Sequence, residues 1–111
     1  MIEISTSEHG SVAVIEVKGR VDSVTAPQFG EALSTPMSSG FRHLVLDLQQ
    51  VDYMSSAGLR ELVNVYKRAN KNAGDLRLVQ PSERVQEILE IAGLDSVFRI
   101  FSTKMEAIGS F

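Results

Sequence analysis

The sequence predicts an α/β fold, in which a mixed sheet of four to five strands carries helices packed mainly on one face. Short runs of apolar residues, alternating or continuous as in strands, recur along the chain. Between the later runs lie segments whose apolar residues are three and four positions apart, as in amphipathic helices. The chain has 111 residues, of which 43% are apolar, enough to bury one core. We therefore expect a single domain over residues 1–111.

The first third of the chain is predicted to form a hairpin followed by a helix. Residues 2–5 alternate between apolar and polar, residues 9–10 favour a turn, and residues 12–17 have the pattern of a second strand. The sequence Thr25-Ala26-Pro27-Gln28 has the form of a capping box with proline in the first turn. A helix is expected to begin there, and Pro36 is expected to mark its end.

The middle of the chain holds the strongest pattern. Residues 44–48 are nearly continuously apolar, as expected for a central strand covered on both faces. After a loop, apolar residues follow at the spacing of one helical face: Leu59, Leu62, Val63 and Tyr66. This indicates an amphipathic helix, closed by Gly74.

The last third is predicted to add a strand over residues 76–79 and a helix starting at residues 81–82. Its inward stripe would be Val85, Ile88, Leu89 and Ala92. Residues 97–101 suggest a short edge strand, and Thr103 with Glu106 forms a second capping box before a terminal helix. Helical crossovers make the later strands parallel, so sites are expected in the loops that follow them.

Composition argues against several classes of function. The net charge of −3 provides no basic surface for nucleic acid. The chain has no cysteine, and its two histidines, His9 and His43, are far apart in sequence, so we expect no metal site and no cofactor. The start has no signal-peptide pattern, and no window approaches the roughly 20 apolar residues of a membrane span. A cytoplasmic protein that does not bind membranes is expected.

Two loops hold the candidate site residues. Gly19-Arg20-Val21-Asp22 follows the second strand, and Ser55-Ser56 precedes the central helix. The start of a helix offers free backbone N–H groups and the positive end of its dipole, so phosphate on a serine there would be stabilised. Either serine could equally act only as the N-cap. Asp22 could likewise only bond its own turn.

Catalytic chemistry has no matching pattern. His43 opens the central strand at the end opposite Ser56, and no Gly-x-Ser-x-Gly elbow is present, which argues against a hydrolytic triad with Asp22. No phosphate-binding Gly-x-x-x-x-Gly-Lys loop occurs, and the first strand is not followed by the paired acids of a receiver domain. We expect no catalytic residue and no enzymatic activity. Asp47, within an apolar strand, is expected to be structural.

A series of motifs, in order over nearly the whole chain, resembles the anti-sigma factor antagonist family of STAS domains. These motifs are Gly19 to Asp22, Ala26-Pro27, Leu46 to Leu48, Tyr53 to Leu59, Gly74 and Ile91 to Leu94. The most specific stretch is Ser56-Ala57-Gly58-Leu59. The resemblance implies a single STAS domain over residues 1–111. It also implies a phosphate acceptor two residues ahead of Gly58-Leu59, which is Ser56 here.

The chain departs from the family pattern Asp-Ser-Ser/Thr-Gly-Leu-Gly at three positions. Ser55 replaces the aspartate, Ala57 replaces the second hydroxyl residue, and Arg60 replaces the last glycine. These departures leave open whether Ser55 substitutes for Ser56 as the acceptor.

The resemblance further implies partner switching. The partner would be a serine-kinase anti-sigma factor, which phosphorylates Ser56, and a metal-dependent serine phosphatase would reverse the reaction. The implied partner-binding residues are Asp22, Ser55, Ser56, Ala57 and Gly58. The alternative is a STAS scaffold without a phosphorylation cycle, or a regulatory subunit of a larger complex such as a transporter or a stress-signalling assembly.

Overall fold

A computed structural model describes residues 2–111 as a five-stranded sheet with four helices. The elements in chain order are β1 (Ile2–His9), β2 (Val12–Val21), α1 (Ala26–Ser38), β3 (His43–Met54), α2 (Ser56–Lys71), β4 (Asp75–Val79), α3 (Glu83–Ile91), β5 (Ile100–Phe101) and α4 (Lys104–Gly109). The strands lie side by side in the order β1-β2-β3-β4-β5. β1 is antiparallel to β2, and the other pairs are parallel, so the predicted mixed sheet is confirmed.

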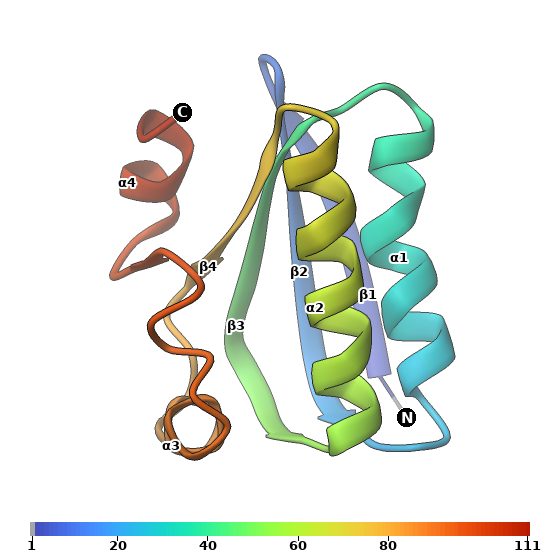
Figure 1. Ribbon diagram of the computed structural model, residues 1–111, viewed down its shortest axis with the longest axis vertical. Helices are drawn as coiled ribbons and strands as arrows, with labels where there is room; N and C mark the ends of the chain where they lie inside the picture. Colours follow the sequence, from blue (N-terminus) through green and yellow to red (C-terminus); the bar gives the residue numbers. More distant parts are fainter. Residues whose placement is uncertain (1) are drawn as a thin grey trace.

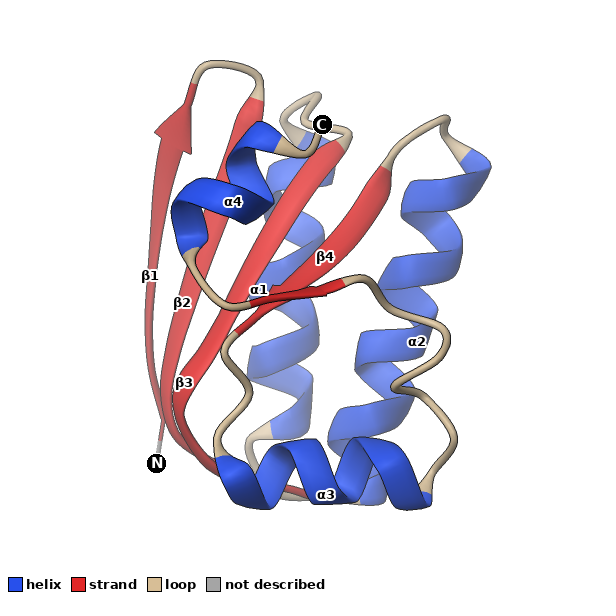
Figure 2. Ribbon diagram, turned by 90° about the vertical axis from the view of Figure 1, so that its left-hand side faces the viewer, coloured by secondary structure: helices blue, strands red, loops and turns tan. Residues whose placement is uncertain are grey.

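The helices are distributed unequally over the two faces. α1 and α2 lie side by side on one face (Figure 1), α3 crosses one end of the sheet, and α4 lies on the other face (Figure 2). The main core fills the space between the sheet and the α1–α2 layer, and its fully buried side chains include Ile15, Phe29, Leu33, Leu46 and Leu62. A smaller cluster under α4 contains Val12, Val14, Val45, Val79 and Ala107.

Helix α1 differs from the prediction at both ends. The side chain of Thr25 makes no N-cap bond to Gln28; it bonds back to Arg20 and Asp22 instead, so the predicted Thr25–Gln28 capping box is wrong. Pro36 lies buried inside the helix, which continues to Ser38. A proline in the last turn removes only one backbone hydrogen bond, and burial of its ring offsets part of that loss.

Helix α2 packs with a slightly different face from the one predicted. Its buried residues are Gly58, Leu62, Val65 and Ala69, whereas Val63 is only half-buried. At its end, Ala73 adopts the left-handed conformation with φ 61°, so Gly74 is not the left-handed terminator. Gly74 is needed for another reason, because a Cβ there would overlap the carbonyl oxygen of Arg42.

Candidate functional site

The strand register brings the two candidate loops together. Val21 and Met54 are partners at the adjoining ends of β2 and β3, and the next residues are Asp22 and Ser55. The Ser55 N–H donates to the carbonyl of Val21 over 2.8 Å, which joins the start of α2 to the end of β2. Gly19 is part of β2 rather than of a turn, with φ 115° beside an irregularity in the register. The predicted loops are therefore short and share one edge.

Asp22 holds the turn that leads into α1. Its Oδ1 accepts hydrogen bonds from the backbone N–H groups of Val24 and Thr25, both over 3.0 Å. In return, the Asp22 N–H donates to the hydroxyl of Thr25 over 2.9 Å. These reciprocal bonds have the geometry of a capping box one turn earlier than the sequence suggested. Hydrogen bonds from the Thr25 backbone are the main cause that lowers the pKa of Asp22, so its carboxylate is ionised at neutral pH.

A cationic and aromatic pair flanks this turn. The Nε of Arg20 lies 3.8 Å from Asp22 Oδ2, and the Arg20 guanidinium lies over the ring of Tyr53 at 4.2 Å from its centroid. The guanidinium of Arg84, from α3, lies 5.9 Å from the same ring. Arg20 and Tyr53 are cross-strand partners, so the sheet itself sets this contact. Sequence reasoning gave neither residue a role, because their pairing depends on the register.

The two serines have different positions and different bonds. Ser55 is the N-cap of α2, and its hydroxyl accepts a hydrogen bond from the Gly58 N–H over 3.3 Å. Ser56 is the first helical residue and is exposed. Within residues 2–111, no group hydrogen-bonds to its hydroxyl. The capping function therefore belongs to Ser55, and Ser56 presents a free hydroxyl to solvent.

Gly58 lets the start of α2 approach the sheet closely. A Cβ at this position would lie 2.7 Å from Val21 Cγ1 and 2.8 Å from Met54 Cγ, both in buried side chains. Ala57 is half-buried against the main core. Of the five predicted partner-binding residues, Ser56 is thus the most accessible, Asp22 and Ser55 are partly exposed, and Gly58 is buried.

Asp47 and His43 have structural roles. The Asp47 carboxylate, 7% exposed, accepts the Gln49 N–H over 2.9 Å and lies 4.0 Å from Lys104 Nζ, as expected for a structural residue. The ring of His43 stacks on Phe111 at 4.5 Å, at the opposite end of β3 from Ser56. His43 and Ser56 therefore do not belong to one site.

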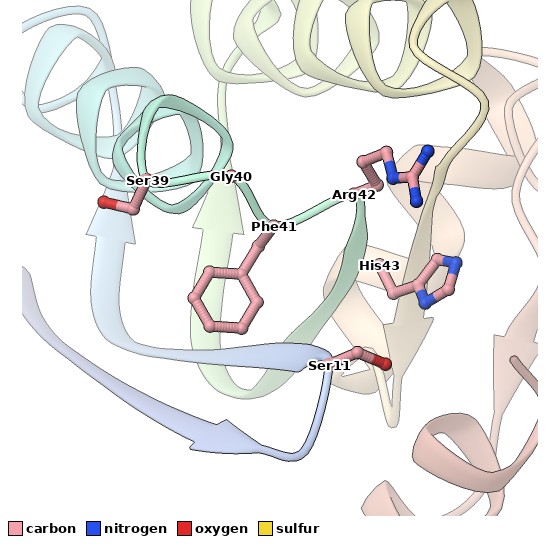
Figure 3. A pocket seen from close by; sticks show the side chains of 6 residues that line it. All are labelled: Ser11, Ser39, Gly40, Phe41, Arg42 and His43. Atoms are coloured by element: carbon pink, nitrogen blue, oxygen red, sulfur yellow. The ribbon is translucent and has the colours of Figure 1, made fainter.

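A pocket of about 220 Å³ lies at that opposite end, where β2 and β3 begin (Figure 3). It is lined by Ser11, Ser39, Gly40, Phe41, Arg42 and His43. Among the described residues, no group of three or more acidic or histidine side chains is placed to hold a metal ion. Within residues 2–111, no helix is long and apolar enough to cross a membrane.

Known proteins of one family resemble this chain in sequence and in fold. The profile of the STAS domain family matches residues 3–107. BtrV of Bordetella bronchiseptica, whose name describes it as an anti-sigma factor antagonist, is 36% identical over 86% of this chain and 82% of its own. A crystal structure of an anti-sigma factor antagonist from Mycobacterium paratuberculosis superposes with a TM-score of 0.89 at 28% identity, covering 99% of this chain and 93% of its own.

The same fold occurs in SpoIIAA of Bacillus, an anti-sigma factor antagonist solved in an unphosphorylated and a phosphorylated form. The TM-scores are 0.82 and 0.76 at 21% and 20% identity. The match covers 96% and 97% of this chain, and 93% and 98% of the respective SpoIIAA chains.

The structure is thus a small α/β domain. Its candidate site lies where β2 and β3 end and α2 begins, and the exposed serine there is Ser56. The chain belongs to the STAS domain family. BtrV and the Mycobacterium paratuberculosis protein both carry the name anti-sigma factor antagonist.

Proposed function

We propose that this chain is an anti-sigma factor antagonist that binds a serine-kinase anti-sigma factor and is switched off by phosphorylation of Ser56. In the unmodified state, the edge formed by the Asp22 turn and the start of α2 docks on the kinase, which then releases its sigma factor. A metal-dependent serine phosphatase restores the unmodified state. The chain itself acts as a non-catalytic binding module, because the kinase supplies ATP and the phosphatase supplies the metal.

The observation that supports the proposal most strongly is that the two serines have different roles at the start of α2. Ser55 occupies the cap position with its hydroxyl engaged, while the exposed Ser56 hydroxyl is free to react. In phosphoryl transfer, the Ser56 oxygen would attack the γ-phosphorus of ATP, its proton would pass to a base of the kinase, and ADP would leave. The Ser55 oxygen, in contrast, already accepts the Gly58 N–H and is less exposed than Ser56.

The surroundings of Ser56 also support a reversible switch. A phosphate at the first helical position adds about −1.5 to −2 charge next to free backbone N–H groups, where an anion is well tolerated. The first turn of α2 contains no acidic side chain that would repel it. SpoIIAA, which shares this fold, has been solved with phosphate attached, so a domain of this shape accommodates the group. At a docked interface, the same charge would have to be desolvated, which disfavours binding.

Phosphopeptide mapping tests the acceptor. The protein is incubated with ATP and each purified serine-kinase anti-sigma factor encoded by its source organism, and its intact mass is then measured. We expect one added phosphate, mapped to Ser56, and no product from Ser56→Ala. The matched control is Ser55→Ala, which removes the neighbouring hydroxyl and should still be modified.

Phosphate that persists at Ser55 in the Ser56→Ala variant would contradict the acceptor assignment. If no kinase modifies either serine, the chain is better explained as a STAS scaffold or as a regulatory subunit of a larger complex. The replacement of the usual aspartate by Ser55, and of the second hydroxyl residue by Ala57, is the observation that favours this second candidate.

A further inference from the structure

We propose that Val24 is the apolar anchor of the docking edge, inserted into an apolar pocket of the serine-kinase partner. The inference rests on the proposed function and adds to it one contact residue, Val24, and the apolar character of the partner surface that receives it. Val24 lies in the loop between β2 and α1, at the same end of the molecule as the start of α2 (Figure 1). It is not among the residues that the sequence motifs single out.

Val24 is the most exposed of the large apolar side chains in residues 2–111. The four that are exposed are Val24 at 84%, Ile91 at 81%, Met105 at 79% and Val97 at 41%. A single exposed apolar residue is common on protein surfaces and is not sufficient evidence of a contact. Two further properties, rigidity and position, distinguish Val24.

The backbone beneath Val24 is held firmly. The Val24 N–H donates to Asp22 Oδ1 over 3.0 Å, and the neighbouring Thr25, only 7% exposed, donates its hydroxyl to the Arg20 carbonyl over 2.9 Å. A β-branched side chain also has few rotamers. The turn therefore presents a fixed apolar group, and little conformational entropy would be lost when a partner binds it.

The position of Val24 places it within the proposed interface. The Asp22 turn is joined to the start of α2 by the 2.8 Å bond between the Ser55 N–H and the Val21 carbonyl. Within the turn, Val24 is flanked by the exposed Ser23 and the ionised Asp22, and the adjoining start of α2 carries the exposed Ser56. An apolar centre with a polar rim is the usual organisation of an interaction hot spot. The complementary partner surface is a small apolar pocket bordered by hydrogen-bond donors for Asp22.

The test compares Val24→Thr with Met105→Thr. Threonine keeps the branched shape of valine at position 24 but introduces a hydroxyl, which an apolar pocket cannot satisfy. Met105 is similarly exposed, but it lies on α4, on the opposite face of the sheet from α1 and α2 (Figure 2). Binding is measured by calorimetry with the kinase that modifies Ser56, loaded with a non-hydrolysable ATP analogue so that the serine stays unmodified.

We expect Kd to rise on the order of tenfold for Val24→Thr and to change less than about twofold for Met105→Thr. Both variants should melt within a few degrees of the parent, because neither side chain is buried. Parent-like binding by Val24→Thr would overturn this inference alone, while a parent protein that binds no kinase would overturn the proposed function with it. A parent dimer that Val24→Thr converts to monomers in sedimentation would assign Val24 to self-association and also overturn the inference.

Discussion

Ser56→Asp is expected to bind the kinase partner at least about tenfold more weakly than the parent, a loss of about 1.4 kcal/mol, because an unpaired charge is costly to desolvate. Its fold should be unaffected. The first turn of α2 contains no acidic residue, so one added carboxylate there is favourable by ~0.3 to 1 kcal/mol. Thermal melts and titration calorimetry on the same preparation separate the two effects.

Ser56→Asn is the matched control, since asparagine has the size of aspartate without its charge. We expect Ser56→Asn to retain most of the affinity. If both variants lose affinity equally, the size of the side chain rather than its charge disrupts the contact, and the electrostatic explanation is wrong.

Leu62→Ala is expected to lower the free energy of unfolding by ~2 to 5 kcal/mol, because it leaves a cavity in the main core. Leu62 is 0% exposed and packs between α2 and the sheet. Denaturant titration followed by circular dichroism measures the change. A Leu62→Ala protein as stable as the parent would contradict the packing described for α2.

The two serines provide graded controls for that measurement. Ser55→Ala removes the N-cap hydrogen bond to Gly58 and should cost about 0.5 to 2 kcal/mol. Ser56→Ala removes a side chain that caps nothing, and its effect should be within about 0.5 kcal/mol of the parent. If Ser56→Ala unfolds as readily as Leu62→Ala, the serine is a structural residue and its exposure has been misinterpreted.

The fold could be predicted because local signals agree with the tertiary structure at most elements. The alternation at the start predicted the hairpin, and the apolar run 44–48 predicted the central strand. Thr103 is the N-cap of α4, as predicted, and its hydroxyl accepts the Glu106 N–H. The assignment of Val63 to the inward stripe was wrong. The buried face of α2 includes the small residues Gly58 and Ala69, whose weak hydrophobicity gives no periodic signal.

The candidate site was predicted in part. The sequence placed a serine pair at the start of the central helix, but it could not assign the cap, which depends on the backbone angles of Ser55. It also ended the second strand too early, since Gly19 with φ 115° resembles a turn residue although β2 continues to Val21. The contact of Arg20 with Tyr53 follows from strand register, which a single sequence does not encode locally.

The most direct test of the switch is the affinity of the kinase partner for two forms of the same chain, unmodified and stoichiometrically phosphorylated at Ser56. Calorimetry is performed on both, with circular dichroism to verify that each is folded. We predict that the phosphorylated form, whose charge exceeds that of a single carboxylate, binds at least as weakly as Ser56→Asp and melts close to the unmodified protein. Equal affinity of the two forms would show that this edge is not the switched docking surface, and the partner-switching account of this chain would be wrong.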